Sequence, residues 1–98
     1  MEIEQLRAYR DDILELAKRH HAPNIRVFGS VARGEASEDS DVDFLIDVSS
    51  EQTVFDLIRL IRALSELLGC EVDVAQSTVL HPMMRDEVLE EAIPLENL

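Results

Sequence analysis

Three aspartates and a glycine–serine pair are the residues of this 98-residue sequence whose types and spacing best suit chemistry. Gly29-Ser30 comes first, and the pair Asp41-x-Asp43 follows after ten intervening residues. Alternate residues of a strand point to one side with Cα atoms about 6.5–7 Å apart, so carboxylates at 41 and 43 can reach the same one or two divalent ions. A hard cation such as Mg²⁺ would also relieve the repulsion between the two charges. The Asp pair therefore predicts a magnesium site.

The Gly29-Ser30 pair predicts a phosphate-binding turn beside that metal. Gly29 has no Cβ, so backbone N–H groups there can approach a phosphate closely, and Ser30 can add its hydroxyl. Asp73 lies on the polar side of a later predicted strand, and pairing of the two strands would bring it beside Asp41 and Asp43. Three carboxylates, hard metal ions and a phosphate cradle are typical of phosphoryl or nucleotidyl transfer.

The elements that must position these residues alternate between helical and strand patterns. Apolar residues at three- and four-residue steps predict helices over 2–21, 53–68 and 82–92, and alternation predicts strands over 25–28, 41–48 and 70–74. Thr53-x-x-Asp56 resembles a capping box, and Gly69 is well placed to end the second helix. Residues 29–40 have the composition of a turn and an exposed loop with one helical turn after Ser30. We expect a single α/β (α+β) domain over 1–98, with a short mixed sheet and helices packed on one face.

Composition narrows the class of protein further. Hydrophobic residues make up 46% of the chain and charged residues 31%, which is typical of a small globular domain. The net charge of −12 argues against direct nucleic-acid binding, because such a surface repels phosphate backbones. No apolar run reaches the ~18–20 residues of a membrane span and the N-terminus lacks a signal-peptide layout, so we expect a cytoplasmic protein without a membrane partner.

Longer stretches of the sequence resemble a known family. The matching runs are Phe28-Gly29-Ser30-Val31-Ala32-Arg33-Gly34-Glu35, Ser40-Asp41-Val42-Asp43-Phe44-Leu45, Val72-Asp73-Val74 and Glu91-Ala92-Ile93-Pro94-Leu95. They resemble the minimal nucleotidyltransferases of the polymerase-beta-like superfamily, and in particular the MntA-type antitoxins that pair with HEPN-domain ribonuclease toxins (HepT). The resemblance implies Mg²⁺-dependent transfer of AMP from ATP to a tyrosine hydroxyl of such a toxin, which neutralises it.

The resemblance also implies roles for individual residues. It places the nucleotide on Gly29, Ser30, Arg33 and Ser40, with Arg33 neutralising phosphate charge. It makes Asp41, Asp43 and Asp73 the catalytic and metal-binding carboxylates, with Asp73 also helping to deprotonate the attacking hydroxyl. Asp47 shares the parity of the Asp pair but lies further along the strand, and we interpret it as solvent-exposed.

Two other functions stay open at this point. The chain could be an acidic antitoxin that blocks a basic ribonuclease by stoichiometric binding with little or no catalysis. It could also transfer a nucleotide to a small-molecule acceptor, although we expect that activity to need a second domain for which a chain of this size has no room. Away from the motif, the simplest interpretation of Glu87, Glu90 and Glu91 is a solvated helix face, and that of Met83 and Met84 is core packing.

Overall fold

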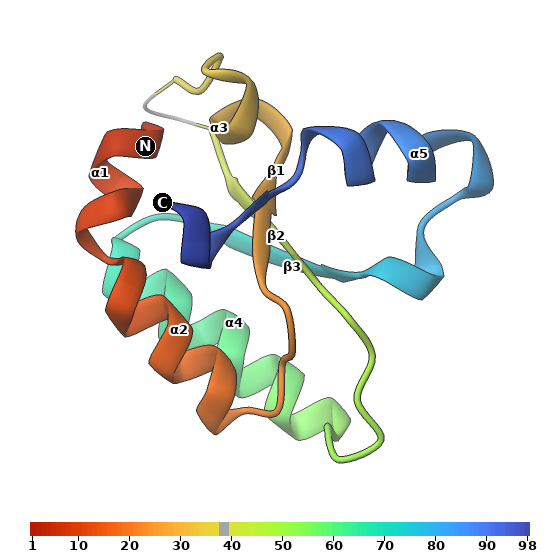
Figure 1. Cartoon of the computed structure of the whole chain (residues 1–98). Helices are drawn as coiled ribbons and strands as arrows, with labels where there is room; N and C mark the ends of the chain where they lie inside the picture. The colour runs from red at the N-terminus through yellow and green to blue at the C-terminus, as the bar shows by residue number, and fades with distance from the viewer. Residues whose placement is uncertain (38–39) are drawn as a thin grey trace.

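The computed structural model describes residues 1–37 and 40–98, and its centre is a four-stranded mixed sheet (Figure 1). The strands are β1 (Arg26–Phe28), β2 (Val42–Ile46), β3 (Val72–Gln76) and β4 (Ile93–Pro94). The α-helices are α1 (Ile3–Ala8), α2 (Arg10–Arg19), α3 (Gly29–Arg33), α4 (Val54–Leu68) and α5 (Pro82–Glu91), and two short 3-10 turns cover Ser77–Val79 and Leu95–Asn97. The predicted fold class, a small mixed sheet with packed helices, is confirmed.

The order of the strands is β3-β2-β1-β4. β1 runs antiparallel to both β2 and β4, whereas β2 and β3 run parallel and are joined through α4. A parallel pair needs such a crossover because the chain must return to the starting edge of the sheet. This β2-α4-β3 unit therefore sets the register between the two strands that carry the predicted carboxylates.

The main core lies on the face of the sheet opposite those carboxylates. Val42, Phe44 and Ile46 of β2 are fully buried there. They belong to one cluster with buried residues of α1, α2 and α4, namely Leu6, Ile13, Ala17, Leu60, Leu64 and Leu68. The alternation of β2 thus turns Asp43 away from the core, as the period of a strand requires.

The α4 helix begins and ends as its sequence predicts. Thr53 Oγ1 accepts a hydrogen bond from the Asp56 backbone N–H (3.1 Å), and Asp56 Oδ2 accepts one from the Thr53 N–H (3.0 Å). Gly69 ends the helix in the left-handed conformation, with φ +68°. The prediction that the apolar residues of this helix face the core is wrong in its first two turns, since Val54 and Ile58 are 71% and 49% exposed. In Figure 1 the first turn of α4 lies at the end of the helix away from the strands.

Several element boundaries differ from the sequence-based expectation. The helix expected over 2–21 is broken at Tyr9, whose N–H bonds to the Leu6 carbonyl three residues back (2.9 Å). β2 stops at Ile46, and Val48 is 51% exposed instead of continuing the strand. The segment at Pro94, which follows the last predicted helix and is not among the predicted strands, pairs with β1 as β4. Local patterning does not mark the first two boundaries, since the alternation continues to Val48 and the helical spacing continues through Tyr9.

The last helix is also less apolar than expected. Val88 is the buried residue of α5, while Met83, Met84 and Leu89 are 84%, 58% and 39% exposed, so core packing is the wrong interpretation for the two methionines. None of the helices in the described ranges combines the length and apolarity needed to cross a membrane.

Candidate active site

Asp43 and Asp73 are direct partners across the parallel strands β2 and β3. Paired residues of adjacent strands lie about 4.8 Å apart in the direction of the backbone hydrogen bonds and point to the same side of the sheet. Asp41 precedes the first residue of β2, where the Val42 N–H bonds to the Glu71 carbonyl (3.0 Å), and it is exposed. The structure therefore brings Asp73 beside Asp43, as expected, and Asp41 lies just before the start of β2.

The electrostatic environment of Asp43 is unfavourable for a carboxylate. Partial burial, followed by the charges of Asp73 and Asp41, raises the pKa of Asp43 above its ordinary value. Arg33 is the nearby cation that opposes this rise. The carboxylates thus form a site where an added divalent cation would remove a repulsion that the protein itself leaves in place.

Gly29 stands directly against this carboxylate. It joins β1 to α3 with φ +74°, and a Cβ added there would lie 2.6 Å from Oδ2 of Asp43. Glycine is required here for two reasons. Residues with a side chain rarely adopt this positive φ, and the Asp43 carboxylate fills the space that a Cβ would need. The close approach places the Gly29 turn and the Asp43 carboxylate side by side, so a group bound at one would contact the other.

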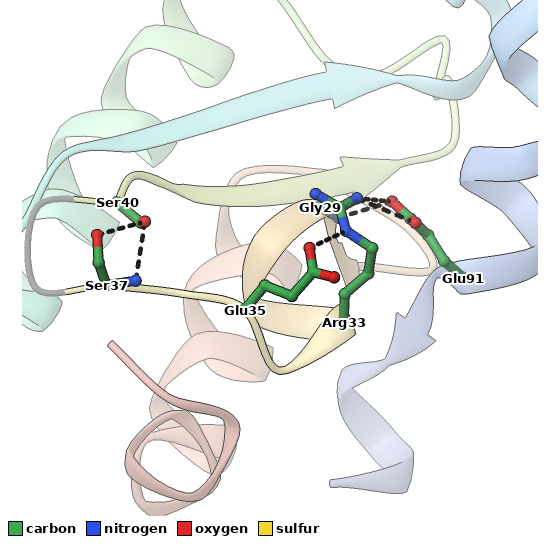
Figure 2. A network of polar contacts seen from close by, with 6 residues as sticks. All are labelled: Gly29, Arg33, Glu35, Ser37, Ser40 and Glu91. Carbon is green, nitrogen blue, oxygen red and sulfur yellow. Dashed lines mark hydrogen bonds and ion pairs between the residues drawn. The ribbon is translucent and has the colours of Figure 1, made fainter.

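Glu91, at the end of α5, accepts hydrogen bonds from the Gly29 backbone and from the Arg33 side chain (Figure 2). Its Oε1 accepts a hydrogen bond from the Gly29 N–H (2.9 Å), and Arg33 Nη1 lies 3.2 Å from both Oε1 and Oε2. Arg33 Nε also donates to Glu35 (3.0 Å). The interpretation of Glu91 as part of a solvated face is therefore wrong. No local signal could have found this role, because the contact joins residues 62 positions apart.

The other expected nucleotide-binding residues lie at two different places. Ser30 is the half-buried second residue of α3, and Arg33 ends that helix instead of lying in a loop. Ser40 Oγ accepts a hydrogen bond from the Ser37 N–H (3.0 Å) and lies 3.0 Å from Ser37 Oγ, to the left of Gly29 in Figure 2. Ser30 and Arg33 thus share the Gly29 turn, whereas Ser40 contacts Ser37 and directly precedes Asp41.

The carboxylates of the site have the chemistry that Mg²⁺ requires of its ligands. Among the described residues, no three His, Cys, Asp or Glu side chains are grouped closely enough to hold an ion by themselves. Magnesium is usually held by one or two carboxylates together with substrate phosphates and water, so a protein-only cage is not required. Asp43 and Asp73, paired beside the Gly29 turn, provide such a partial set.

Asp47 has a structural role instead of full solvent exposure. Its carboxylate accepts hydrogen bonds from Asn24 (3.0 Å), Arg26 (2.7 Å) and Ser77 (3.1 Å). The Asn24 hydrogen bond, followed by the charge of Arg26, holds the pKa of Asp47 below its ordinary value. Because these partners come from the chain on both sides of β2, Asp47 ties the end of that strand to its neighbours.

Comparison with known proteins identifies the class. The family model described as the Nucleotidyltransferase domain matches residues 6–95. The chain belongs to this family and is therefore a nucleotidyltransferase, in agreement with the resemblance seen in its motifs.

Curated relatives are similar over most of their length. The protein adenylyltransferase MntA of Thermococcus cleftensis is 40% identical over 79 residues, which cover 81% of this chain and 80% of the relative. A protein of Methanocaldococcus jannaschii, provisionally assigned as a protein adenylyltransferase, is 38% identical over 81 residues, covering 83% and 87% of the two chains.

Solved structures share the fold. One described provisionally as a minimal nucleotidyltransferase is 51% identical and superposes with a TM-score of 0.86 over 96% of both chains. A structure of a tri-AMPylated Shewanella oneidensis HEPN toxin in complex with its MNT antitoxin matches with a TM-score of 0.67 at 18% identity, over 95% of this chain and 71% of that one. At that identity the second match shows the fold alone.

Proposed function

We propose that this nucleotidyltransferase is an antitoxin that transfers AMP from ATP to a tyrosine hydroxyl of a HEPN-domain ribonuclease toxin, and so neutralises it. The pairing of Asp43 with Asp73 beside the Gly29 turn is the observation that carries the proposal. The names of the adenylyltransferase relatives, and the AMPylated HEPN toxin held by a protein of the same fold, support the choice of nucleotide and acceptor.

The carboxylates would bind magnesium together with the triphosphate. Asp41, Asp43 and Asp73 would hold the ions, and Gly29, Ser30, Arg33 and Ser40 would hold the nucleotide. Bound Mg²⁺ would supply charge neutralisation for the triphosphate and its leaving group. The requirement for a cation is consistent with the raised pKa of Asp43, because the apo site accumulates negative charge.

The reaction breaks the phosphoanhydride bond between the α- and β-phosphates of ATP and forms a phosphate ester to the tyrosine. The phenolic oxygen attacks the α-phosphorus, the bond to the bridging oxygen breaks, and pyrophosphate leaves with the electron pair. Asp73 is exposed at the edge of the carboxylate pair, where it would accept the phenolic proton. In-line positioning of the acceptor would come from the toxin surface, which has to lie over β3 and the Gly29 turn.

The net charge of −12 suits a basic partner. Opposite fields accelerate encounter and favour the complex, so the same acidic surface would serve binding as well as catalysis. Binding alone could neutralise the toxin, and transfer to a small molecule is the other activity that an experiment has to separate.

The test combines the purified chain, ATP and Mg²⁺ with the protein encoded next to it, and measures the intact mass of that partner. We expect AMP-sized additions that disappear in EDTA, and that map to a tyrosine after digestion. The variants Asp43→Asn and Asp73→Asn should abolish them, while Asp47→Asn, a matched loss of one carboxylate just after the end of β2, should retain them.

Each remaining result has a defined meaning. Additions that persist in the Asp43→Asn/Asp73→Asn double variant would overturn the assigned site. Full protection from ribonuclease activity by that variant, without modification of the toxin, would favour stoichiometric binding. Nucleotide transfer to a small acceptor by the isolated chain, with none to the partner protein, would contradict a protein substrate.

A further inference from the structure

Glu91 holds the groups that the proposed function assigns to the triphosphate. Figure 2 shows its carboxylate between the end of α5 and the Gly29 turn, with dashed contacts to the Gly29 N–H (2.9 Å) and to Arg33 Nη1 (3.2 Å to each oxygen). The side chain is 24% exposed, so it is more enclosed than its neighbours Glu87 and Glu90, which are exposed. One acidic side chain of α5 is thus drawn into the site while the others face solvent.

The contact leaves few of these donors for a phosphate. A backbone amide has one hydrogen, and that of Gly29 points at Glu91 Oε1. Two of the three guanidinium nitrogens of Arg33 are also engaged, Nε by Glu35 and Nη1 by Glu91. A carboxylate and a phosphate are both anionic acceptors for the same kinds of donor, so they compete for this turn.

The negative charge of Glu91 also opposes nucleotide binding. It adds to the negative field of Asp43, Asp73 and Asp41 at the place where a nucleotide with several negative charges has to bind. Arg33 offsets only part of this field, and it is already shared between two glutamates.

We propose that Glu91 occupies the phosphate position of the Gly29 turn in the free protein, and that the nucleotide has to displace it. Glu91 thereby sets the affinity of the site for nucleotide. The helix α5 ends at Glu91 and the chain becomes extended at Ala92 (ψ 132°), so rotation of the flexible Glu91 side chain can clear the turn without moving a strand. This inference rests on the proposed function, because it takes the Gly29 turn as the phosphate site.

The experiment measures the dissociation constant of AMP-PNP with Mg²⁺ for the whole chain by calorimetry. Glu91→Gln keeps the length of the side chain but removes the charge, and Glu91→Asp keeps the charge but shortens the reach. Both should bind about three- to tenfold more tightly than the natural chain, because a charge-assisted competitor is weakened. Glu90→Gln, which changes net charge equally one residue away, should change the constant less than about twofold.

The outcomes separate this inference from the function on which it rests. If the natural chain shows no Mg²⁺-dependent binding of AMP-PNP, the proposed function fails. If the natural chain binds and both Glu91 variants bind equally or more weakly, Glu91 is a brace for the Gly29 turn and the inference is overturned. Thermal melts of each variant identify a loss of folding, and Glu91→Asp provides the test if Glu91→Gln does not fold. In steady state, displacement predicts a lower KM for ATP in the Glu91 variants, with little change in kcat.

Discussion

A side chain at position 29 would collide with Asp43, since a Cβ there would lie 2.6 Å from its Oδ2. This relationship joins the residue after β1 to the second residue of β2 and places the glycine turn against the carboxylate pair. It also makes the architecture of the site testable at a single backbone position.

We expect Gly29→Ala to abolish transfer and to lower stability by more than the roughly 1–2 kcal/mol of a left-handed alanine. The alanine has to accept φ +74° and also displaces the Asp43 carboxylate. The matched control is Gly69→Ala, which has φ +68° and nothing within 4 Å of its added Cβ. Denaturant unfolding and the AMP-transfer assay should show strain alone in Gly69→Ala. Equal losses of stability in both variants, with activity kept in Gly29→Ala, would contradict the close contact.

Removal of the Asp43 charge should stabilise the apo protein while it abolishes activity. The folded-state pKa of Asp43 is raised by burial and by Asp73 and Asp41, so the folded protein favours the protonated form. That preference stabilises the fold at acidic pH and is lost as the pH rises through the raised pKa. Asp43→Asn should therefore have a higher Tm than the natural chain at pH 7 in EDTA, and the difference should shrink below the ordinary aspartate value of 3.8.

Melts with added Mg²⁺ and nucleotide provide the control for Asp43→Asn. Added Mg²⁺ with nucleotide should raise the Tm of the natural chain and leave that of Asp43→Asn nearly unchanged, because ligand binding stabilises only the state that binds. A lower Tm for the asparagine variant at pH 7 in EDTA would show that Asp43 is held by favourable contacts instead.

Asp47 should show the opposite pH dependence. Its pKa is lowered by Asn24 and Arg26, so its contribution to stability is present above the ordinary value of 3.8 and is lost as the pH falls through the folded-state pKa. The side chain is 42% exposed, and solvent screening should keep the loss in Asp47→Asn at or below about 1 kcal/mol at pH 7. Thermal melts between pH 7 and pH 2.5 measure this. The stability losses of Asn24→Ala and Asp47→Asn should not add in the double variant. Simple additivity would show that the hydrogen bond between Asn24 and Asp47 contributes nothing.

The Thr53 cap should contribute measurably to the element that sets the register of Asp73. Thr53→Ala removes the acceptor for the Asp56 N–H and should lower the free energy of unfolding by about 1 kcal/mol. Thr53→Ser keeps the hydroxyl and should remain close to the natural chain. Urea unfolding checks both variants, and an equal loss in the serine variant would assign the effect to the methyl group.

The carboxylate pair is the part of the site that the sequence by itself determined. Alternation in β2 turns Val42, Phe44 and Ile46 into the core and therefore turns Asp43 outward, and the same period in β3 turns Asp73 to that side. The Thr53 cap and the Gly69 stop are equally local, since each depends on residues within one helical turn. Such features follow from chain geometry alone.

Only the tertiary structure decided which groups surround that pair. Glu91 reaches Gly29 across 62 residues, Asp47 joins Arg26 across 21, and Pro94 becomes an edge strand by pairing with Arg26. A charged residue in a helix has the same local pattern whether it faces solvent or another element. Its partner depends on how the whole chain closes around the core, and that closure is determined by long-range packing.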